Sequence, residues 1–360
     1  MLALDILAGL AGAALVISSL ADLFMSVVVP RSVGGRFRAS VLISRNGWRW
    51  WRERALNIDD AEQREDTLAL FAPTFLVTLL AYWVLSQIIG YGLLFWALRA
   101  GLRPEPHLGG AVYFAGASLL TIGYGDIVPL HWYTRALSLA AAGGGLATFA
   151  TVTTFLFQTF GAFQRRESFV VTMSERTGAP PSGLEFVIRH IKLDLMHDVG
   201  PILRDAQRWI AEVMETHLAY PVLTYFRSSH DDESWVGTLG ALLDASTLLI
   251  TTLDLDHRGE AEITTRIGTH LVRDFTGFFR LPAADVAGVE YEEFGLAYAQ
   301  LQALGVALRP LEDAWPAFAA KRAGYAVPLD AMARWWRIPP ARWIGDRSRV
   351  RSHVNVGAVH

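Results

Sequence analysis

The chain has 360 residues, of which 52% are hydrophobic and 19% are charged, and its formal net charge is −3 at pH 7. This composition is typical of a protein that combines membrane-spanning segments with a sizeable soluble part. The absence of cysteine excludes disulfides and cysteine-ligated metal sites.

The first expected element is a membrane-spanning helix over Leu2–Val29. It lacks the positive n-region of a signal peptide and its apolar run is too long for one, so we expect it to be retained. Asp22 lies inside this segment, and intramembrane carboxylates are costly and often functional. Asp22 could pair with a basic residue or take part in gating. Alternatively, it could lie near the interface, solvated or bonded to Ser18 or Ser19.

An arginine- and tryptophan-rich segment, residues 31–66, follows. Its basic residues favour a cytoplasmic location by the positive-inside rule; they are Arg31, Arg36, Arg38, Arg45, Arg49, Arg52 and Arg54. Tryptophan prefers the headgroup level and arginine is attracted to anionic lipid, so we expect an interfacial helix here. The residues expected to contact anionic lipid are Arg45, Trp48, Arg49, Trp51 and Arg52.

Two stretches without charge, Thr67–Leu98 and Ala136–Gln164, each have about 30 residues, and about 20 suffice to cross the hydrocarbon core. Between them lies the apolar run Leu108–Leu120, which is too short to span. Irregular backbone is tolerated at membrane depth only where it is buried in protein or lines a water-filled path. The order therefore predicts an outer helix, a re-entrant pore helix and an inner helix.

The hexapeptide after the pore helix reads Thr121-Ile122-Gly123-Tyr124-Gly125-Asp126. Its alternating glycines allow backbone carbonyls to align along one axis. Carbonyl oxygens arranged in rings can replace the water shell of K⁺. The segment resembles the selectivity filter of the potassium channel family, and the resemblance covers about Thr67–Gln164.

This resemblance implies K⁺ ions held at Thr121, Ile122, Gly123 and Tyr124 and no organic cofactor. One filter per chain and rings of four carbonyls imply a homotetramer. In the inner helix the resemblance implies a hinge at Gly143, Gly144 and Gly145; close packing against the pore helix is the alternative explanation of these glycines. Helical spacing from Gly145 predicts that Phe149, Thr153 and Phe157 line the cavity.

The chain also departs from the family pattern. Leu120 stands where members often have threonine, and Gly116-Ala117-Ser118 stands where a pore-helix glutamate is frequent. We therefore expect fewer side-chain hydrogen bonds to brace the filter.

After Arg166, charged residues and helical periodicity return, and strand signals are sparse. We expect an all-α domain with helices over 184–216 (interrupted near Pro201), 237–253, 263–279, 291–308 and 311–323. No G-x-G-x-x-G turn follows a strand here, so the dinucleotide-fold ligand domain of many bacterial potassium channels is not expected.

Ligand sites in this domain are weakly indicated. His190, Asp194 and His197 have the spacing of one helix face, which would suit a metal ion, a pH sensor or an ordinary solvated surface. Four carboxylates could offer oxygens to a divalent cation without matching a known calcium loop; they are Asp254, Asp256, Glu260 and Glu262. A basic aromatic tail that could touch lipid headgroups or a neighbouring subunit includes Trp335, Trp336, Arg337, Arg342 and Trp343.

The sequence thus predicts an all-α membrane protein with three transmembrane helices, one re-entrant pore helix with its filter, and an all-α cytoplasmic domain. The expected parts are residues 1–30, 31–66, 67–164 (pore), 165–345 (helical domain) and 346–360 (a disordered tail). The expected location is the cell (inner) membrane, multi-pass, with an external N-terminus and a cytoplasmic C-terminal domain.

The function predicted is a tetrameric potassium channel gated through its helical domain, not an enzyme and not a nucleic-acid binder. The alternatives are a membrane sensor with a vestigial pore, a weakly selective cation channel and a subunit of a potassium transporter.

Overall fold

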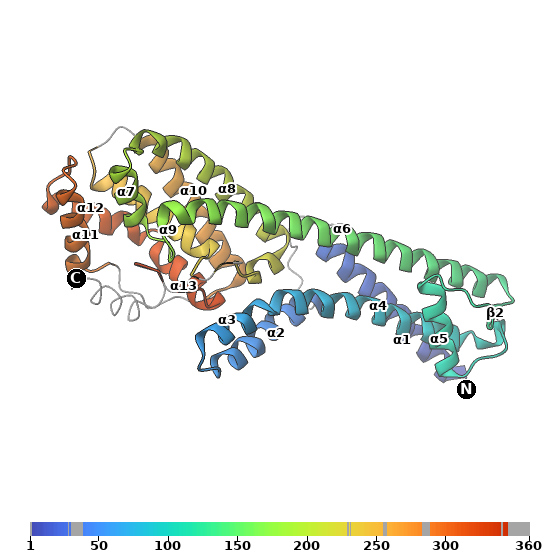
Figure 1. Ribbon diagram of the computed structural model, residues 1–360. Helices are drawn as coiled ribbons and strands as arrows, with labels where there is room; N and C mark the ends of the chain where they lie inside the picture. The colour runs from blue at the N-terminus through green and yellow to red at the C-terminus, as the bar shows by residue number, and fades with distance from the viewer. Residues whose placement is uncertain are drawn as a thin grey trace. The chain divides into compact units, whose positions relative to one another are not determined.

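The computed structural model describes residues 2–27, 29, 39–228, 230, 232–254, 258–282, 289–339 and 341–344. Predictions for Arg31, Arg36, Arg38, Asp256 and the 346–360 tail lie outside these residues. The chain divides into two compact units, Met1–Phe160 (unit 1) and Gly161–His360 (unit 2). Figure 1 labels their helices and strands.

Unit 1 is built from α1 (Leu2–Val27), α2 (Ala39–Leu56), α3 (Ala61–Ala69), α4 (Phe71–Ala97), α5 (Leu108–Leu119) and the first part of α6 (Trp132–Thr177). A single 3₁₀ turn, η1 (Arg99–Gly101), and two short strands, β1 (Leu102–Arg103) and β2 (Val128–Pro129), complete it. Three helical stretches are long and apolar enough to cross a membrane, namely Leu2–Val27, Glu62–Ala97 and Trp132–Thr177. The predicted all-α class with three spanning helices is confirmed.

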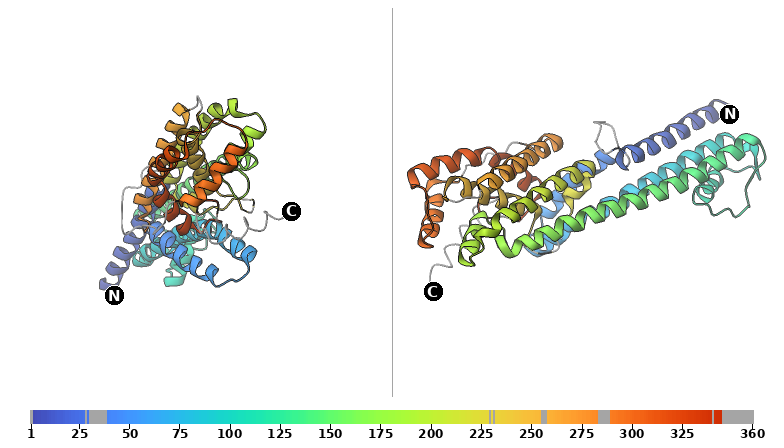
Figure 2. Two further views of the ribbon diagram at one scale, coloured as in Figure 1. Left: turned by 90° about the vertical axis from the view of Figure 1, so that its left-hand side faces the viewer. Right: turned by 90° about the horizontal axis from the view of Figure 1, so that it is seen from above.

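Helix α1 packs along α4 through small residues. A Cβ on Gly12 would lie 2.5 Å from the Gly90 carbonyl oxygen, so only glycine allows this crossing. At the N-terminal end, Asp5 pairs with Arg99 (2.6 Å). The N-terminus of α1 and the turn between α5 and α6 consequently lie at the same end of unit 1 (Figure 2).

The intramembrane carboxylate of Asp22 is buried where α1, α2 and α4 meet. It accepts hydrogen bonds from the Trp83 indole nitrogen (2.9 Å) and from the Ser40 hydroxyl (2.8 Å). Ser19, suggested by the sequence as a partner of Asp22, instead donates to the Trp83 carbonyl (3.2 Å). Donors from two other helices satisfy both carboxylate oxygens, which indicates a structural junction of three helices.

Strands β1 and β2 pair antiparallel, with Leu102 opposite Pro129 and Arg103 opposite Val128. They tie the loop before α5 to the loop after residue 126. A hydrophobic cluster including Phe95, Ala111, Phe114, Leu119 and Ala141 packs α5 between α4 and α6. This core holds the C-terminal end of α5, and therefore the segment that follows it.

Unit 2 contains the end of α6 and the helices α7 (Gly183–Lys192), α8 (Val199–Ala219), α9 (Trp235–Thr251), α10 (Arg258–Phe279), α11 (Tyr291–Ala303), α12 (Leu311–Ala323) and α13 (Ala326–Trp336). Two 3₁₀ segments are η2 (Met196–Asp198) and η3 (Pro221–Tyr225). Helix α9 is the centre, since all of its residues except Ile250 are buried. Such all-round burial matches its largely apolar sequence.

The interior of unit 2 also contains a buried ion pair. Asp244 of α9 accepts from the Arg322 guanidinium (2.9 Å) and from the Tyr325 hydroxyl (2.6 Å). Arg322 also donates to the Trp343 carbonyl. The interpretation of residues 335–343 as a lipid-touching tail is wrong for Trp336 and Trp343, because both side chains are buried in this core.

Candidate functional site

The segment after α5 begins as a helix cap. Thr121 has a positive φ of 56°. Its N–H donates to the Ser118 carbonyl (3.1 Å), and the N–H of Ile122 donates to the Ala117 carbonyl (2.8 Å). These two bonds are those of the Schellman motif, with Thr121 in the left-handed position usually given to glycine. The N–H groups of the segment are thereby directed back into α5.

The conformation alternates along the same segment. Gly123 and Gly125 also have positive φ values, 63° and 80°. Successive carbonyls of an extended strand point to opposite sides, whereas alternation of left-handed with right-handed residues brings them to one side. Among the described residues, the carbonyls of 121–124 accept no intrachain hydrogen bond. These residues are exposed in the single chain, and carbonyl oxygens in a row without protein donors are suited to a cation.

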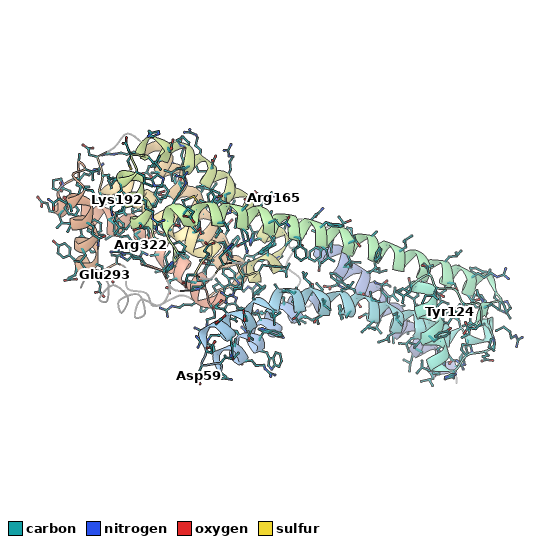
Figure 3. The ribbon with its side chains drawn as sticks, in the orientation of Figure 1. Asp59, Tyr124, Arg165, Lys192, Glu293 and Arg322 are labelled. Carbon is teal, nitrogen blue, oxygen red and sulfur yellow. The ribbon has the colours of Figure 1, made fainter. Side chains whose placement is uncertain are left out.

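Two tyrosines meet where α5 supports the segment. The ring of Tyr113 stacks on that of Tyr124 at 6.5 Å between centroids, with the planes nearly parallel. Tyr124 is 71% exposed and lies at the end of unit 1 (Figure 3). The ring of Tyr113 on α5 thus packs against Tyr124 of the segment.

Helix α6 supports α5 through one glycine. A Cβ on Gly145 would overlap the Leu119 carbonyl oxygen and lie 2.8 Å from its carbon, whereas a Cβ on Gly143 would meet nothing within 4 Å. Close packing therefore accounts for Gly145. The helix is continuous through Gly143, Gly144 and Gly145, and their use as a hinge stays a prediction. Nearby, the Gln87 amide bonds the Thr148 hydroxyl (3.0 Å) and joins α4 to α6.

The residues predicted to line a cavity lie on the opposite side of α6 from Thr148 and Phe155. Phe149 and Phe157 are 71% and 76% exposed in the isolated chain, and Thr153 is partly exposed. Their common face is consistent with the predicted lining, which stays a prediction.

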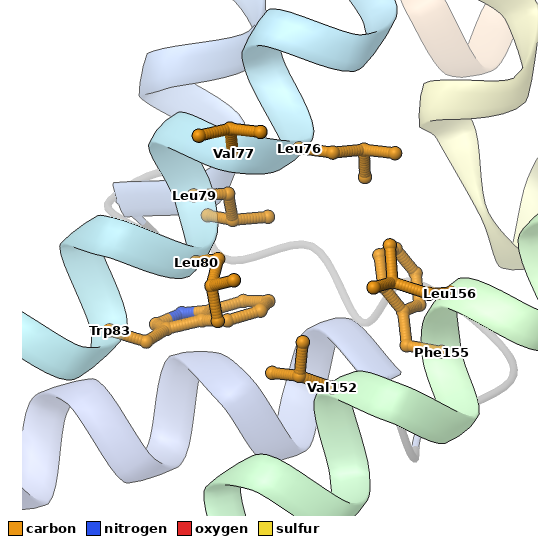
Figure 4. A pocket seen from close by; sticks show the side chains of 8 residues that line it. All are labelled: Leu76, Val77, Leu79, Leu80, Trp83, Val152, Phe155 and Leu156. Carbon is orange, nitrogen blue, oxygen red and sulfur yellow. The ribbon is translucent and has the colours of Figure 1, made fainter.

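The buried side of α6 forms an apolar cavity of about 70 Å³ with α4. Figure 4 shows the side chains of the two helices facing each other across it. The lining residues are Leu76, Val77, Leu79, Leu80, Trp83, Val152, Phe155 and Leu156. The indole N–H of Trp83 is already donated to Asp22. The cavity therefore offers room for a few methylene groups and no ligands for an ion.

The histidine cluster predicted in unit 2 does not form. Helix α7 ends at Lys192, so Asp194 and His197 lie beyond it, and the expectation of one shared helix face is wrong. His190 is buried and bonds the Arg176 guanidinium, whereas His197 is exposed. Among the described residues, no group of three or more histidine, aspartate or glutamate side chains is placed to hold a metal.

In a comparison with known proteins, residues 77–162 match a family model described as "ion channel". The chain is also 23% identical over 208 residues to YdjJ, an uncharacterized membrane protein of Bacillus subtilis, covering 56% of this chain. The alignment spans 59% of the length of YdjJ. No solved structure matches significantly. The family match covers α5, residues 121–126 and most of the spanning parts of α4 and α6, and supports an ion channel in a membrane.

Proposed function

We propose that this chain is a potassium-selective channel with its conduction path at residues 121–126. The observation that carries the proposal is the row of carbonyls at 121–124, which receive no hydrogen bond from the described residues while the neighbouring N–H groups cap α5. Such oxygens match the coordination that K⁺ prefers over a hydration shell. The ion-channel match over residues 77–162 supports the assignment.

One chain supplies only one side of such a path, so we infer a homotetramer with the path on its symmetry axis. The uncovered side chains of Ile122, Tyr124, Phe149 and Phe157 are consistent with surfaces that other copies cover. Native mass measurement of the purified protein should give four chains. Monomers or dimers alone would remove this arrangement.

Flux into liposomes tests conduction. K⁺ uptake should exceed Na⁺ uptake and be blocked by Ba²⁺, which has the size of K⁺. The variant Gly123→Ala should lose selectivity, because its Cβ meets no neighbour but its φ of +63° strains any L side chain. The matched control is Gly116→Ala, where a Cβ would make ordinary contacts with Ile88, and it should behave like wild type.

The alternatives give different results in the same assay. A weakly selective cation channel would pass Na⁺ and K⁺ equally. A membrane sensor with a vestigial pore would pass neither ion while still folding. The alternation of positive φ values at Thr121, Gly123 and Gly125 favours a working filter over both.

We further propose that the protein is a multi-pass protein of the cell (inner) membrane, with the N-terminus outside and unit 2 in the cytoplasm. We also propose that unit 2 controls the opening of the channel. Helix α6 runs without interruption from Trp132 to Thr177, so unit 2 is continuous with the inner helix. A ligand of unit 2 can shift the gate only by its different affinities for the open and closed states.

Anionic lipid is the proposed partner of α2. The expected contacts with lipid change, because two of the expected residues, Trp48 and Trp51, bind other parts of unit 1. Trp48, 1% exposed, packs on Phe71 at 5.0 Å, and Trp51 donates to the Thr67 carbonyl (2.6 Å). These two rings anchor α2 to α3 and α4. The side of α2 available to headgroups carries Arg45, Arg49 and Trp50, the last 55% exposed. Raising the phosphatidylglycerol fraction of the liposomes should change flux, and the change should be smaller in Arg45→Gln/Arg49→Gln.

A further inference from the structure

The part of α6 that belongs to unit 2 is held by two arginines that reach histidines on other helices. Arg166 lies 3.1 Å from Nε2 of His217 on α8, and Arg176 lies 3.1 Å from Nε2 of His190 on α7. Both histidines are buried. A guanidinium has donors only, so each Nε2 must accept and must therefore carry no proton.

The second ring nitrogen fixes the tautomer of each histidine. Nδ1 of His190 lies 2.7 Å from the Phe186 carbonyl oxygen, which only accepts, so Nδ1 carries the proton. Nδ1 of His217 lies 3.1 Å from the Thr216 hydroxyl oxygen, whose own proton goes to the Glu212 carbonyl. Each Arg–His pair therefore requires a neutral imidazole, and a second proton would add a cation directly against a guanidinium.

Arg166 does more than bond a histidine. It donates to the carbonyls of Leu223 (2.8 Å) and Phe226 (2.9 Å), which lie in and just after η3. Its Nε donates to Glu167 (2.8 Å). The side chain thus fastens α6 to η3, and His217 lies beside this connection, against Trp235 and Phe275.

We propose that unit 2 is a proton sensor in which the pairs Arg166–His217 and Arg176–His190 clamp the end of α6 and release it when the histidines are protonated. The gating consequence rests on the proposed channel function; the clamp itself does not. The charged groups that act on the two imidazoles are Arg166, Arg176 and Asp198, and Glu167 is bonded to Arg166. Glu167 and Asp198 oppose the arginine charges without removing them, and Asp244 is bonded to Arg322 and Tyr325.

The direction of the pH effect follows from the same contacts. Burial, and next the Arg166 charge, hold the pKa of His217 well below its usual value. Burial also lowers the pKa of His190, and Arg176 acts in the same direction. A released imidazole takes up a proton near pH 6.5. The clamp is therefore fully present above about pH 6.5 and is lost as the pH falls toward the depressed pKa values.

Hydrogen–deuterium exchange of the full-length protein in vesicles tests the clamp directly. Below about pH 6.5, each histidine should increase local opening of α6 and η3 by up to about tenfold per pH unit, after correction for intrinsic exchange. His217→Gln/His190→Gln should remove this pH dependence. The matched control is His270→Gln, because His270 is exposed and pairs only with Asp274 among the described residues. Protection that is equal at pH 8 and pH 5.5 in wild type would overturn the proposal.

A second measurement needs no variant. Exchange of the imidazole C2 hydrogen gives the pKa of each histidine in the native protein. His217 and His190 should titrate below the usual imidazole value of about 6.5, and values at or above it would overturn the clamp even if the double variant failed to fold.

Flux at different internal pH values then separates this proposal from the channel function. Flux that changes with internal pH in wild type and not in the double variant supports gating by the clamp. If hydrogen exchange shows that α6 is released at low pH but no K⁺ flux occurs at any pH, the channel function is contradicted and the clamp proposal is still supported. If hydrogen exchange shows release of α6 at low pH but K⁺ flux does not change with pH, the proposal that the clamp controls gating is overturned.

Discussion

The two glycines Gly143 and Gly145 give a matched pair of substitutions in the inner helix. A Cβ at 145 would overlap the Leu119 carbonyl oxygen, while a Cβ at 143 meets nothing within 4 Å. Overpacking costs about 1–3 kcal/mol, and glycine is about 1 kcal/mol worse than alanine inside a helix. Gly145→Ala should therefore destabilise the protein by up to about 2 kcal/mol net, and Gly143→Ala should stabilise it by up to about 1 kcal/mol.

Leu119 ends α5 two residues before Thr121, so the strain from Gly145→Ala falls on the cap that holds the proposed filter. We expect a lower K⁺ over Na⁺ flux ratio for this variant and an unchanged ratio for Gly143→Ala. Thermal unfolding in detergent and flux in liposomes measure the two effects. Equal stability and selectivity of the two variants would refute the packing argument, and altered gating in Gly143→Ala alone would instead favour a hinge.

Three further predictions concern other parts of the chain. Arg322→Met leaves the Asp244 carboxylate buried without its cation and should cost about 3–5 kcal/mol in unfolding free energy, measured by thermal or denaturant unfolding. Asp22→Asn leaves one acceptor oxygen where the carboxylate has two, so either the Trp83 indole or the Ser40 hydroxyl loses its bond to residue 22; this should cost about 1–3 kcal/mol and lower the melting temperature without changing ion selectivity. Ending the chain after Arg176 should change open probability in single-channel recordings while selectivity stays intact; lost selectivity would mean that unit 2 supports the filter.

The parts of the fold set by local sequence were predictable. Uncharged runs predicted α4 and α6, and the expected helix at 311–323 coincides with α12 (Leu311–Ala323). Helix α13 was missed, because Trp335 and Trp336 were interpreted as part of a basic tail. Its apolar residues Leu329, Met332, Ala333 and Trp336 follow the spacing i, i+3, i+4, i+7, and this signal could have identified it.

Contacts between distant residues were not predictable. The sequence identified the two glycines of the proposed filter, but it did not indicate the left-handed Thr121, which caps the end of α5. Asp22 was recognised as unusual, yet its donors Ser40 and Trp83 lie 18 and 61 residues away. His217 carried no signal at all, since a lone histidine in a helix has no pattern that indicates its arginine.

The two ends of α6 are held by different chemistry, and this difference separates two kinds of control. In unit 1 the helix packs through Gly145 and the neutral pair Gln87–Thr148, whose interactions do not change with pH. In unit 2 it is held by arginines that donate to the imidazoles of His217 and His190, among other acceptors. Protonation of these imidazoles in acid removes the nitrogen lone pair that accepts the hydrogen bond. Protons should therefore alter the contacts of α6 in unit 2 and leave the filter support unchanged. It follows that the K⁺ over Na⁺ ratio should stay constant across the pH range in which open probability changes.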